Sequence, residues 1–230
     1  MKVLGIIGGV APESTIEYYR FIIESYRSKK QDGSYPPIII NSINMKKMLD
    51  LLWGGQLTEV TDYLVDEIKK LSAAGAEFGL IASNTPHLVF DGIRRQSPIP
   101  LISIVEAAYE KAKDTGVKKL GLFGTRSTMQ GKFYPDIFLK GNIQIVAPDS
   151  EEQEYIHTKY MSELVNGIFL DETRNKMLDI VKKMKDKLGI EGLILGGTEL
   201  PLILRNTDSG IPLFDTTKIH VEAAVNQMLV

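Results

Sequence analysis

Short apolar segments recur along the chain, and each is continuous rather than alternating with polar residues. They are rich in β-branched residues and are bounded by Gly, Pro, Asn or Asp. This pattern is typical of strands that are buried on both faces of a parallel sheet. The predicted strands are Val3–Ile7, Ile38–Ile43, Phe78–Ala82, Leu101–Ile104, Leu120–Phe123, Ile143–Val146 and Leu193–Leu195.

Longer amphipathic segments separate these strands. Between Leu57 and Ala74, apolar residues recur at helical spacing, at Val60, Leu64, Ile68 and Leu71. Strands that alternate with helices predict an α/β fold with a mainly parallel sheet covered on both faces. The predicted helices are Glu13–Ser28, Leu57–Ala74, Ile104–Asp114, Thr128–Lys140, Glu151–Val165, Glu172–Lys187 and Thr216–Met228.

Two pairs of similar segments indicate an internal repeat. Leu4–Gly8 resembles Leu120–Gly124 at an offset of 116 (120 − 4), and Gly79–Ser83 resembles Gly192–Gly196 at an offset of 113 (192 − 79). Buried strands are built from few residue types, so a chance match is the alternative explanation. The repeat predicts two similar lobes, with one lobe formed by residues 1–99 and 208–230 and the other by residues 100–207. Their junction falls within the proline-marked segment Ser97–Pro100.

Composition is that of a globular protein: 43% of the 230 residues are hydrophobic, and the net charge is −2. No long basic run points to nucleic acid or to an anionic membrane surface. The apolar run at the N-terminus is too short to span a membrane, and it lacks the cleavage site of a signal peptide. We therefore expect a cytoplasmic protein without a nucleic-acid or membrane partner.

The chain contains no cysteine, which excludes disulfides, thiolate metal ligands and cysteine nucleophiles. The three histidines are His87, His157 and His220, and they do not follow a metal-ligand spacing. We therefore expect no metal site.

Ligands of open parallel sheets bind beyond the carboxyl ends of the strands. Most of the loops at these ends are rich in small polar residues and could offer backbone N–H groups to a carboxylate or a phosphate. The first loop does not follow the dinucleotide pattern G-x-G-x-x-G, and no acidic residue ends the next strand. The five loops are Gly8–Pro12, Asn41–Met45, Ser83–Thr85, Gly124–Met129 and Gly196–Glu199.

Two interpretations are open for the segment from Ser83 to His87. It could be a helix cap followed by a proline in the first turn. Alternatively, Asn84 and Thr85 could donate hydrogen bonds to a bound carboxylate. The histidine is either buried and fully hydrogen-bonded or a carrier of protons.

Two interpretations are also open for the loops Gly196–Glu199 and Gly124–Met129. Glu199 either caps the helix that follows it or contacts a ligand. In the loop Gly124–Met129, Ser127 or Thr128 could be an ordinary N-cap. Three hydroxyls within four residues at a strand end also suit the binding of a carboxylate.

Together, these loops resemble the aspartate/glutamate racemase family. The segments that carry the resemblance are IGGVAPEST, NSINMKKM, ASNTPH, FGTRSTM and GGTELP, and they occur in the family's order along essentially the whole chain. The resemblance implies two similar α/β lobes that face each other across an active-site cleft, often in a homodimer.

The family resemblance implies an isomerase that inverts the α-carbon of an amino acid, typically an acidic one, without pyridoxal phosphate or another cofactor. Two bases on opposite faces of the substrate share this work, and both are usually cysteines. In this sequence, their positions are taken by Ser83 and Gly197. A serine hydroxyl is a weak base unless a strong neighbour takes its proton, and glycine has no side chain. His87 could assist Ser83, or Glu199 could turn inward to act as the base.

The substrate-binding residues implied by the resemblance are better preserved. They hold the α-carboxylate or lie beside it, and they are Asn84, Thr85, Thr125, Thr128, Thr198 and Glu199. A second carboxylate could pair with Lys46 or Lys47. Because both cysteine positions are replaced, a non-catalytic protein that binds an amino acid or a dicarboxylate is the alternative function. A lyase, a decarboxylase or a cis-trans isomerase is a third.

Overall fold

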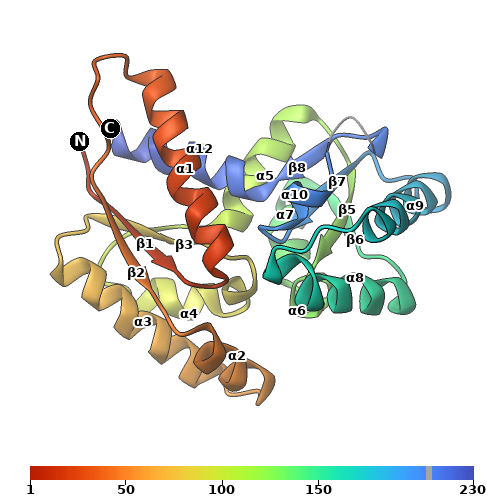
Figure 1. Cartoon of the computed structure of the whole chain (residues 1–230), viewed down its shortest axis with the longest axis horizontal. Coiled ribbons are helices and arrows are strands. Elements are labelled where there is room, and N and C mark those ends of the chain that lie inside the picture. The colour runs from red at the N-terminus through yellow and green to blue at the C-terminus, as the bar shows by residue number, and fades with distance from the viewer. Residues whose placement is uncertain (206–208) are drawn as a thin grey trace. The chain divides into compact units, whose positions relative to one another are not determined.

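The computed structural model describes residues 1–205 and 209–230 (Figure 1). By its internal contacts, the chain divides into one unit of Met1–Ile104 with Thr217–Val230 and a second unit of Val105–Thr216. The predicted boundary between residues 99 and 100 falls earlier, because the strand that follows it pairs with the first sheet. The predicted boundary between residues 207 and 208 lies outside the described residues.

The first unit is built on a four-stranded parallel sheet in the order β2-β1-β3-β4. Its strands are β1 (Leu4–Gly8), β2 (Ile38–Ser42), β3 (Phe78–Ile81) and β4 (Leu101–Ile102). Its helices are α1 (Pro12–Lys29), α2 (Met45–Trp53), α3 (Leu57–Ala73), the 3₁₀ turn η1 (Thr85–Val89), α4 (Phe90–Gln96) and α12 (Thr216–Met228).

Helices cover both faces of this sheet (Figure 1). Leu4 and Ile6 pack against α1 and α12 on one face. Ile7, whose side chain points the opposite way, packs with α2, α3 and α4 on the other. Burial of the strand on both faces explains why it has a continuous apolar sequence.

The second unit repeats this plan with a four-stranded parallel sheet in the order β6-β5-β7-β8. Its strands are β5 (Lys119–Gly124), β6 (Gln144–Val146), β7 (Gly192–Gly196) and β8 (Leu213–Asp215). Its helices are α5 (Ile104–Thr115), α6 (Arg126–Gln130), α7 (Phe133–Phe138), η2 (Leu139–Gly141), α8 (Ser150–Ser162), η3 (Leu164–Asn166), α9 (Asp171–Leu188) and α10 (Leu200–Ile203).

The two sheets confirm the predicted fold class of two similar α/β lobes with parallel sheets. All seven predicted strands are present, and β8 is an additional one that the sequence pattern did not reveal. The predicted helix Thr128–Lys140 is wrong in its extent, because Gly131 adopts an extended conformation (ψ 151°) and divides it into α6, α7 and η2. Helices α2, α4 and α10 were also not predicted.

A buried polar network joins α1, α12 and β4 in the first unit. The Tyr18 hydroxyl lies 2.8 Å from Nδ1 of His220, and Nε2 of His220 lies 3.0 Å from the Ile102 carbonyl oxygen. Because a carbonyl only accepts, Nε2 carries the proton, and Nδ1 accepts from the tyrosine. Burial lowers the pKa of His220 to about 4. This histidine therefore contributes to the fold as a neutral ring.

The buried histidines predict a loss of stability in mild acid. Burial also lowers the pKa of His87, to about 3, whereas the ordinary value is 6.5. The unfolded chain binds protons first, so the stabilisation is complete above pH 6.5 and is lost as the pH falls toward these lowered values. Each histidine contributes a slope that approaches about 1.4 kcal/mol per pH unit.

Urea unfolding followed between pH 5 and 7 measures this slope. The carboxylates with lowered pKa values, such as Asp149 and Glu163, act mainly below this range. His220→Gln keeps a donor and an acceptor but does not titrate. The substitution should therefore lower the slope of the unfolding free energy against pH by up to about 1.4 kcal/mol per pH unit. A slope that is the same in the variant would contradict this assignment.

Candidate active site

The predicted site loops follow the two central strands of each sheet. In the first unit, β1 and β3 are neighbours, with Ile7 paired with Ile81. In the second unit, β5 and β7 are neighbours, with Gly124 paired with Gly196. Since β3 and β7 hold the same place in the two sheet orders, the loops that begin at Ser83 and Gly197 are equivalent.

The loop after β3 consists of buried polar residues. Ser83, Asn84 and Thr85 all have less than a tenth of their surface exposed. Asn84 occupies the N-cap position of η1, but its side chain makes no capping hydrogen bond. The simple cap predicted as one alternative therefore does not explain the asparagine. Its assignment to substrate binding, like that of Thr85, stays a prediction.

His87 is buried and fully hydrogen-bonded rather than placed to receive a proton from the serine hydroxyl. Its Nδ1 lies 3.0 Å from the carbonyl oxygen of Ser83, and its Nε2 accepts the backbone N–H of Ile104 at 3.2 Å. The ring stacks on Phe90 with 4.5 Å between centroids. Desolvation, with a smaller effect from His220, lowers the pKa of His87 to about 3. This histidine positions the loop and does not activate Ser83.

The loop after β5 is closed by a threonine pair. Thr125, rather than the predicted Ser127 or Thr128, is the N-cap of α6, and its hydroxyl accepts the backbone N–H of Thr128 at 3.3 Å. Thr128 is fully buried. A Cβ added at Gly124 or Gly196 would lie 2.8 Å and 3.0 Å, respectively, from side-chain carbons of Thr128. The threonine side chain therefore packs across the ends of both strands.

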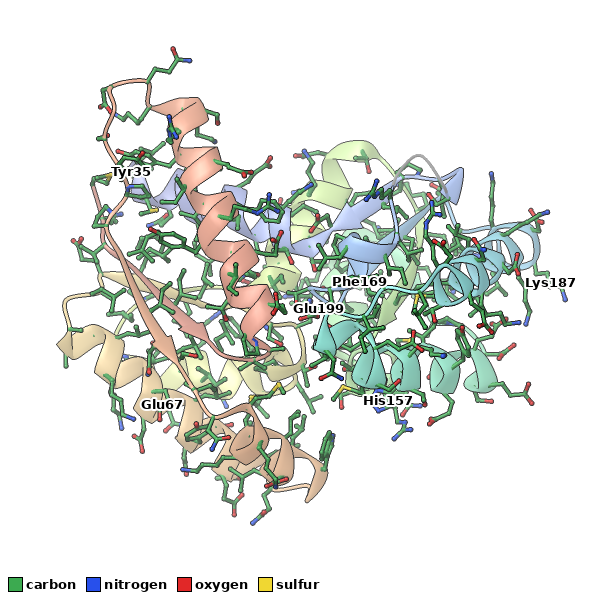
Figure 2. The ribbon with its side chains drawn as sticks, viewed as in Figure 1. Tyr35, Glu67, His157, Phe169, Lys187 and Glu199 are labelled. Carbon is green, nitrogen blue, oxygen red and sulfur yellow. The ribbon has the colours of Figure 1, made fainter. Side chains whose placement is uncertain are left out.

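The loop after β7 contains a buried carboxylate. Glu199 has 1% of its surface exposed, and Figure 2 labels it where the chain enters α10. It occupies the N-cap position of α10 without a capping hydrogen bond from its side chain. The Thr198 hydroxyl donates to Glu199 Oε2 at 2.9 Å, and the Tyr160 hydroxyl donates to the same oxygen. In this arrangement, the hydroxyls of Thr198 and Tyr160 are both engaged by the carboxylate.

Tyr160, on α8, fills the space that a side chain at position 197 would occupy. A Cβ added at Gly197 would lie 2.9 Å from both Cζ and the hydroxyl oxygen of Tyr160, and closer still to Cε2. The tyrosine is 6% exposed and belongs to the core cluster of this unit. Our sequence analysis missed this residue, because its spacing along α8 is that of an ordinary core position.

The two lysines that could pair with a second carboxylate have partners at the surface. Lys46 Nζ lies 2.6 Å from Asp50 Oδ2, and both side chains are exposed. Lys47 Nζ lies 4.3 Å from the centre of the Tyr63 ring. Exposed contacts of this kind contribute little free energy, so a ligand could compete for either lysine.

No three His, Asp or Glu side chains in residues 1–205 and 209–230 gather closely enough to hold a metal ion. No helix in this part of the chain has the length and apolar character needed to cross a membrane.

The family model for Asp/Glu/Hydantoin racemases matches residues 7–224 of the chain. The chain therefore belongs to this racemase family, as the motif resemblance predicts. The match covers the loops after all four central strands of the two sheets.

Known relatives resemble the chain over its full length. A Yersinia pestis protein classed with the Asp/Glu racemases has 34% sequence identity and a TM-score of 0.92, and both chains are covered completely. An aspartate racemase homologue from Pyrococcus horikoshii OT3 has 36% identity and a TM-score of 0.86, again over both whole chains. The broad specificity amino-acid racemase RacX of Bacillus subtilis (strain 168) is 24% identical over 98% of each chain.

The contact between Tyr160 and Gly197 predicts strong coupling between these two positions. Gly197→Ala should destabilise the protein by about 1–3 kcal/mol, because the buried ring can move only by disturbing its bond to Glu199. In a Tyr160→Leu background, the same alanine should cost at least about 1 kcal/mol less. Urea unfolding of the four proteins completes this double-mutant cycle, and additive effects would show that the ring does not restrict position 197.

Proposed function

We propose that this chain binds an acidic amino acid, aspartate or glutamate, and moves its α-proton without a cofactor. The observation that carries this proposal is the equivalence of the loops after β3 and β7, which places Ser83 and Gly197 at matching positions in two similar sheets. A reaction that inverts an α-carbon needs one proton carrier for each face of the substrate. The repeated fold provides two such positions.

The preference for an acidic substrate is supported by the relatives. The Pyrococcus horikoshii protein is described as an aspartate racemase homologue, and the Yersinia pestis protein is classed with racemases of aspartate and glutamate. Both are more than 30% identical to this chain over its full length. RacX, by contrast, is described as having broad specificity, so the substrate panel should extend beyond these two amino acids.

The α-carboxylate is assigned to donors in the strand-end loops. Asn84 and Thr85 would donate from the loop after β3, and their burial provides a medium in which a charged hydrogen bond is strong. The remaining donors, Thr125, Thr128 and Thr198, belong to the loops after β5 and β7. Since their side chains already bond within these loops, we expect their contribution to depend on rearrangement or on backbone N–H groups. The proposal includes a homodimer in the cytoplasm.

Reaction at the Ser83 position should be slow. Within the described residues, the Ser83 hydroxyl makes no hydrogen bond to a histidine or a carboxylate, because His87 bonds to the serine's carbonyl oxygen instead. A serine without a base holds its proton far too tightly to accept one efficiently at neutral pH. We therefore expect α-proton exchange well below the rate of a thiol-containing site.

A non-catalytic protein that binds an amino acid or a dicarboxylate is the second candidate function. The absence of a side chain at Gly197 favours it, together with the ring of Tyr160 that fills this space. In that case, the protein would retain the carboxylate-binding loops and lack proton transfer.

Proton NMR of L-aspartate and L-glutamate in heavy water separates the two candidates. The proposed function predicts loss of the α-proton signal over hours, with the D-enantiomer detected by a chiral assay on the same samples. Calorimetric titration with each enantiomer measures binding independently. Saturable binding without any exchange would favour the binding protein and would contradict the proposed activity.

Ser83→Cys should increase the rate of α-proton exchange by about 10²-fold, because a thiol has an accessible thiolate form near neutral pH and nearly the shape of serine. Ser72→Cys is the matched control, because it adds a thiol near the end of α3 that precedes β3 rather than at the carboxyl end of a strand. It should leave the rate unchanged. An equal effect of the two substitutions, or no effect of Ser83→Cys on a protein that still binds aspartate, would contradict the assignment of Ser83.

A further inference from the structure

Tyr160, Glu199 and Thr198 form a compact cluster at the carboxyl end of β7. Both hydroxyls donate to one oxygen of the carboxylate, Glu199 Oε2, and the exposed fractions of the three residues are 6%, 1% and 5%, respectively. A buried carboxylate that accepts hydrogen bonds from two hydroxyls is placed to take a proton along either bond without moving. The cluster therefore holds a phenol and a carboxylate in a fixed geometry.

The tyrosine also occupies a particular place in the loop. A Cβ at Gly197 would lie closest to Cε2 of the ring and 2.9 Å from the hydroxyl oxygen, so the ring edge and the hydroxyl together fill the space beside the glycine. The glycine is what permits this approach, since any larger residue would displace the ring. The phenol hydroxyl thus lies beside the position equivalent to Ser83.

We propose that Tyr160 is the proton carrier beside the loop after β7 and that Glu199 is the group that takes and returns its hydroxyl proton. This inference rests on the proposed function, because it assumes that the loop after β7 binds the substrate. It gives the chain a proton-carrying group at a position where its own residue, Gly197, has none.

The step balances without any other reactant. The bond between the α-carbon and its hydrogen breaks, and the proton goes to the phenol oxygen of Tyr160. The hydroxyl proton of Tyr160 passes to Glu199 Oε2 along their existing hydrogen bond. The electron pair stays on the α-carbon and is delocalised into the substrate's carboxylate. Protonation of the α-carbon reverses each of these transfers.

The surroundings of the phenol suit this role. Burial, followed by the charge of Glu199, raises the pKa of Tyr160 well above its ordinary value. The phenol therefore keeps its hydroxyl proton at neutral pH, so its oxygen can take the α-proton only as that hydroxyl proton passes to Glu199. Glu199 removes the hydroxyl proton only as the new one arrives. Carboxylates act as the base in other enzymes that remove protons next to a carbonyl group.

Two substitutions and a matched control test the proposal in the full chain. Tyr160→Phe keeps the ring and removes the hydroxyl, and Glu199→Gln keeps the shape but cannot take the proton. Each should lower kcat for α-proton exchange of L-aspartate by about 10²-fold, with KM changed by less than about threefold. Tyr155→Phe removes a hydroxyl from the same helix and should leave both constants unchanged.

A fluorinated tyrosine at position 160 keeps the test informative if either substitution disturbs the fold. 3-Fluorotyrosine keeps the ring and the hydroxyl but has a lower phenol pKa. It should lower the rate and move the pH profile of exchange to lower pH, because the phenol oxygen becomes a weaker base. A hydroxyl with only a structural role would leave the profile in place, and that result would overturn the proposal.

The outcomes separate this inference from the proposed function. If the unmodified chain exchanges no α-proton of any amino acid tested, the proposed function itself fails. If it does exchange, and folded Tyr160→Phe protein that binds L-aspartate exchanges equally fast, only the role of Tyr160 fails. If exchange falls in both variants and the fluorinated protein shows the shifted profile, Tyr160 carries the proton.

Discussion

The close approach of the Tyr160 ring to Gly197 determines what the loop after β7 can do. Because the ring and its hydroxyl occupy the space beside the glycine, no side chain fits there without displacing them. The hydroxyl is held by Glu199, so displacement would also leave a buried carboxylate short of a donor, which costs about 1–3 kcal/mol or more. The glycine, the tyrosine and the glutamate thus form one unit, in which a change at one position requires a change at another.

The two equivalent loops differ in the role of their buried acid–base groups. After β3, both ring nitrogens of His87 form hydrogen bonds with the backbone, and the ring holds the loop in place. After β7, the Glu199 carboxylate accepts hydrogen bonds from the Tyr160 and Thr198 hydroxyls. The parallel sheets place both loops at carboxyl ends of central strands. In the proposed roles, only the loop after β7 lies beside a phenol and a carboxylate that together could move a proton. The two loops are accordingly unlike, although they follow equivalent strands of a repeated fold.

Most of the fold could be predicted from sequence, because strands buried on both faces leave continuous apolar segments. Strand β8 escaped because its sequence, Leu213–Asp215, has only two apolar residues and no β-branched one, and the break at Gly131 was not visible in a helical pattern. The site loops were found for the same reason as the strands that they follow. Tyr160 was not identified from sequence, because its proposed role depends on a hydrogen bond to Glu199, which is 39 positions away in the sequence. No local pattern reports such a contact.

The most direct test of this account is carbon NMR of the chain labelled at Cζ of tyrosine, recorded during titration with L-aspartate. The Tyr160 resonance, identified by its loss in Tyr160→Phe, should shift as the ligand saturates the site, because the proposed role puts the phenol oxygen against the reacting carbon. The Tyr155 resonance should stay in place. Saturation of the site, measured by calorimetry on the same samples, with an unchanged Tyr160 resonance would show that the tyrosine is only part of the core.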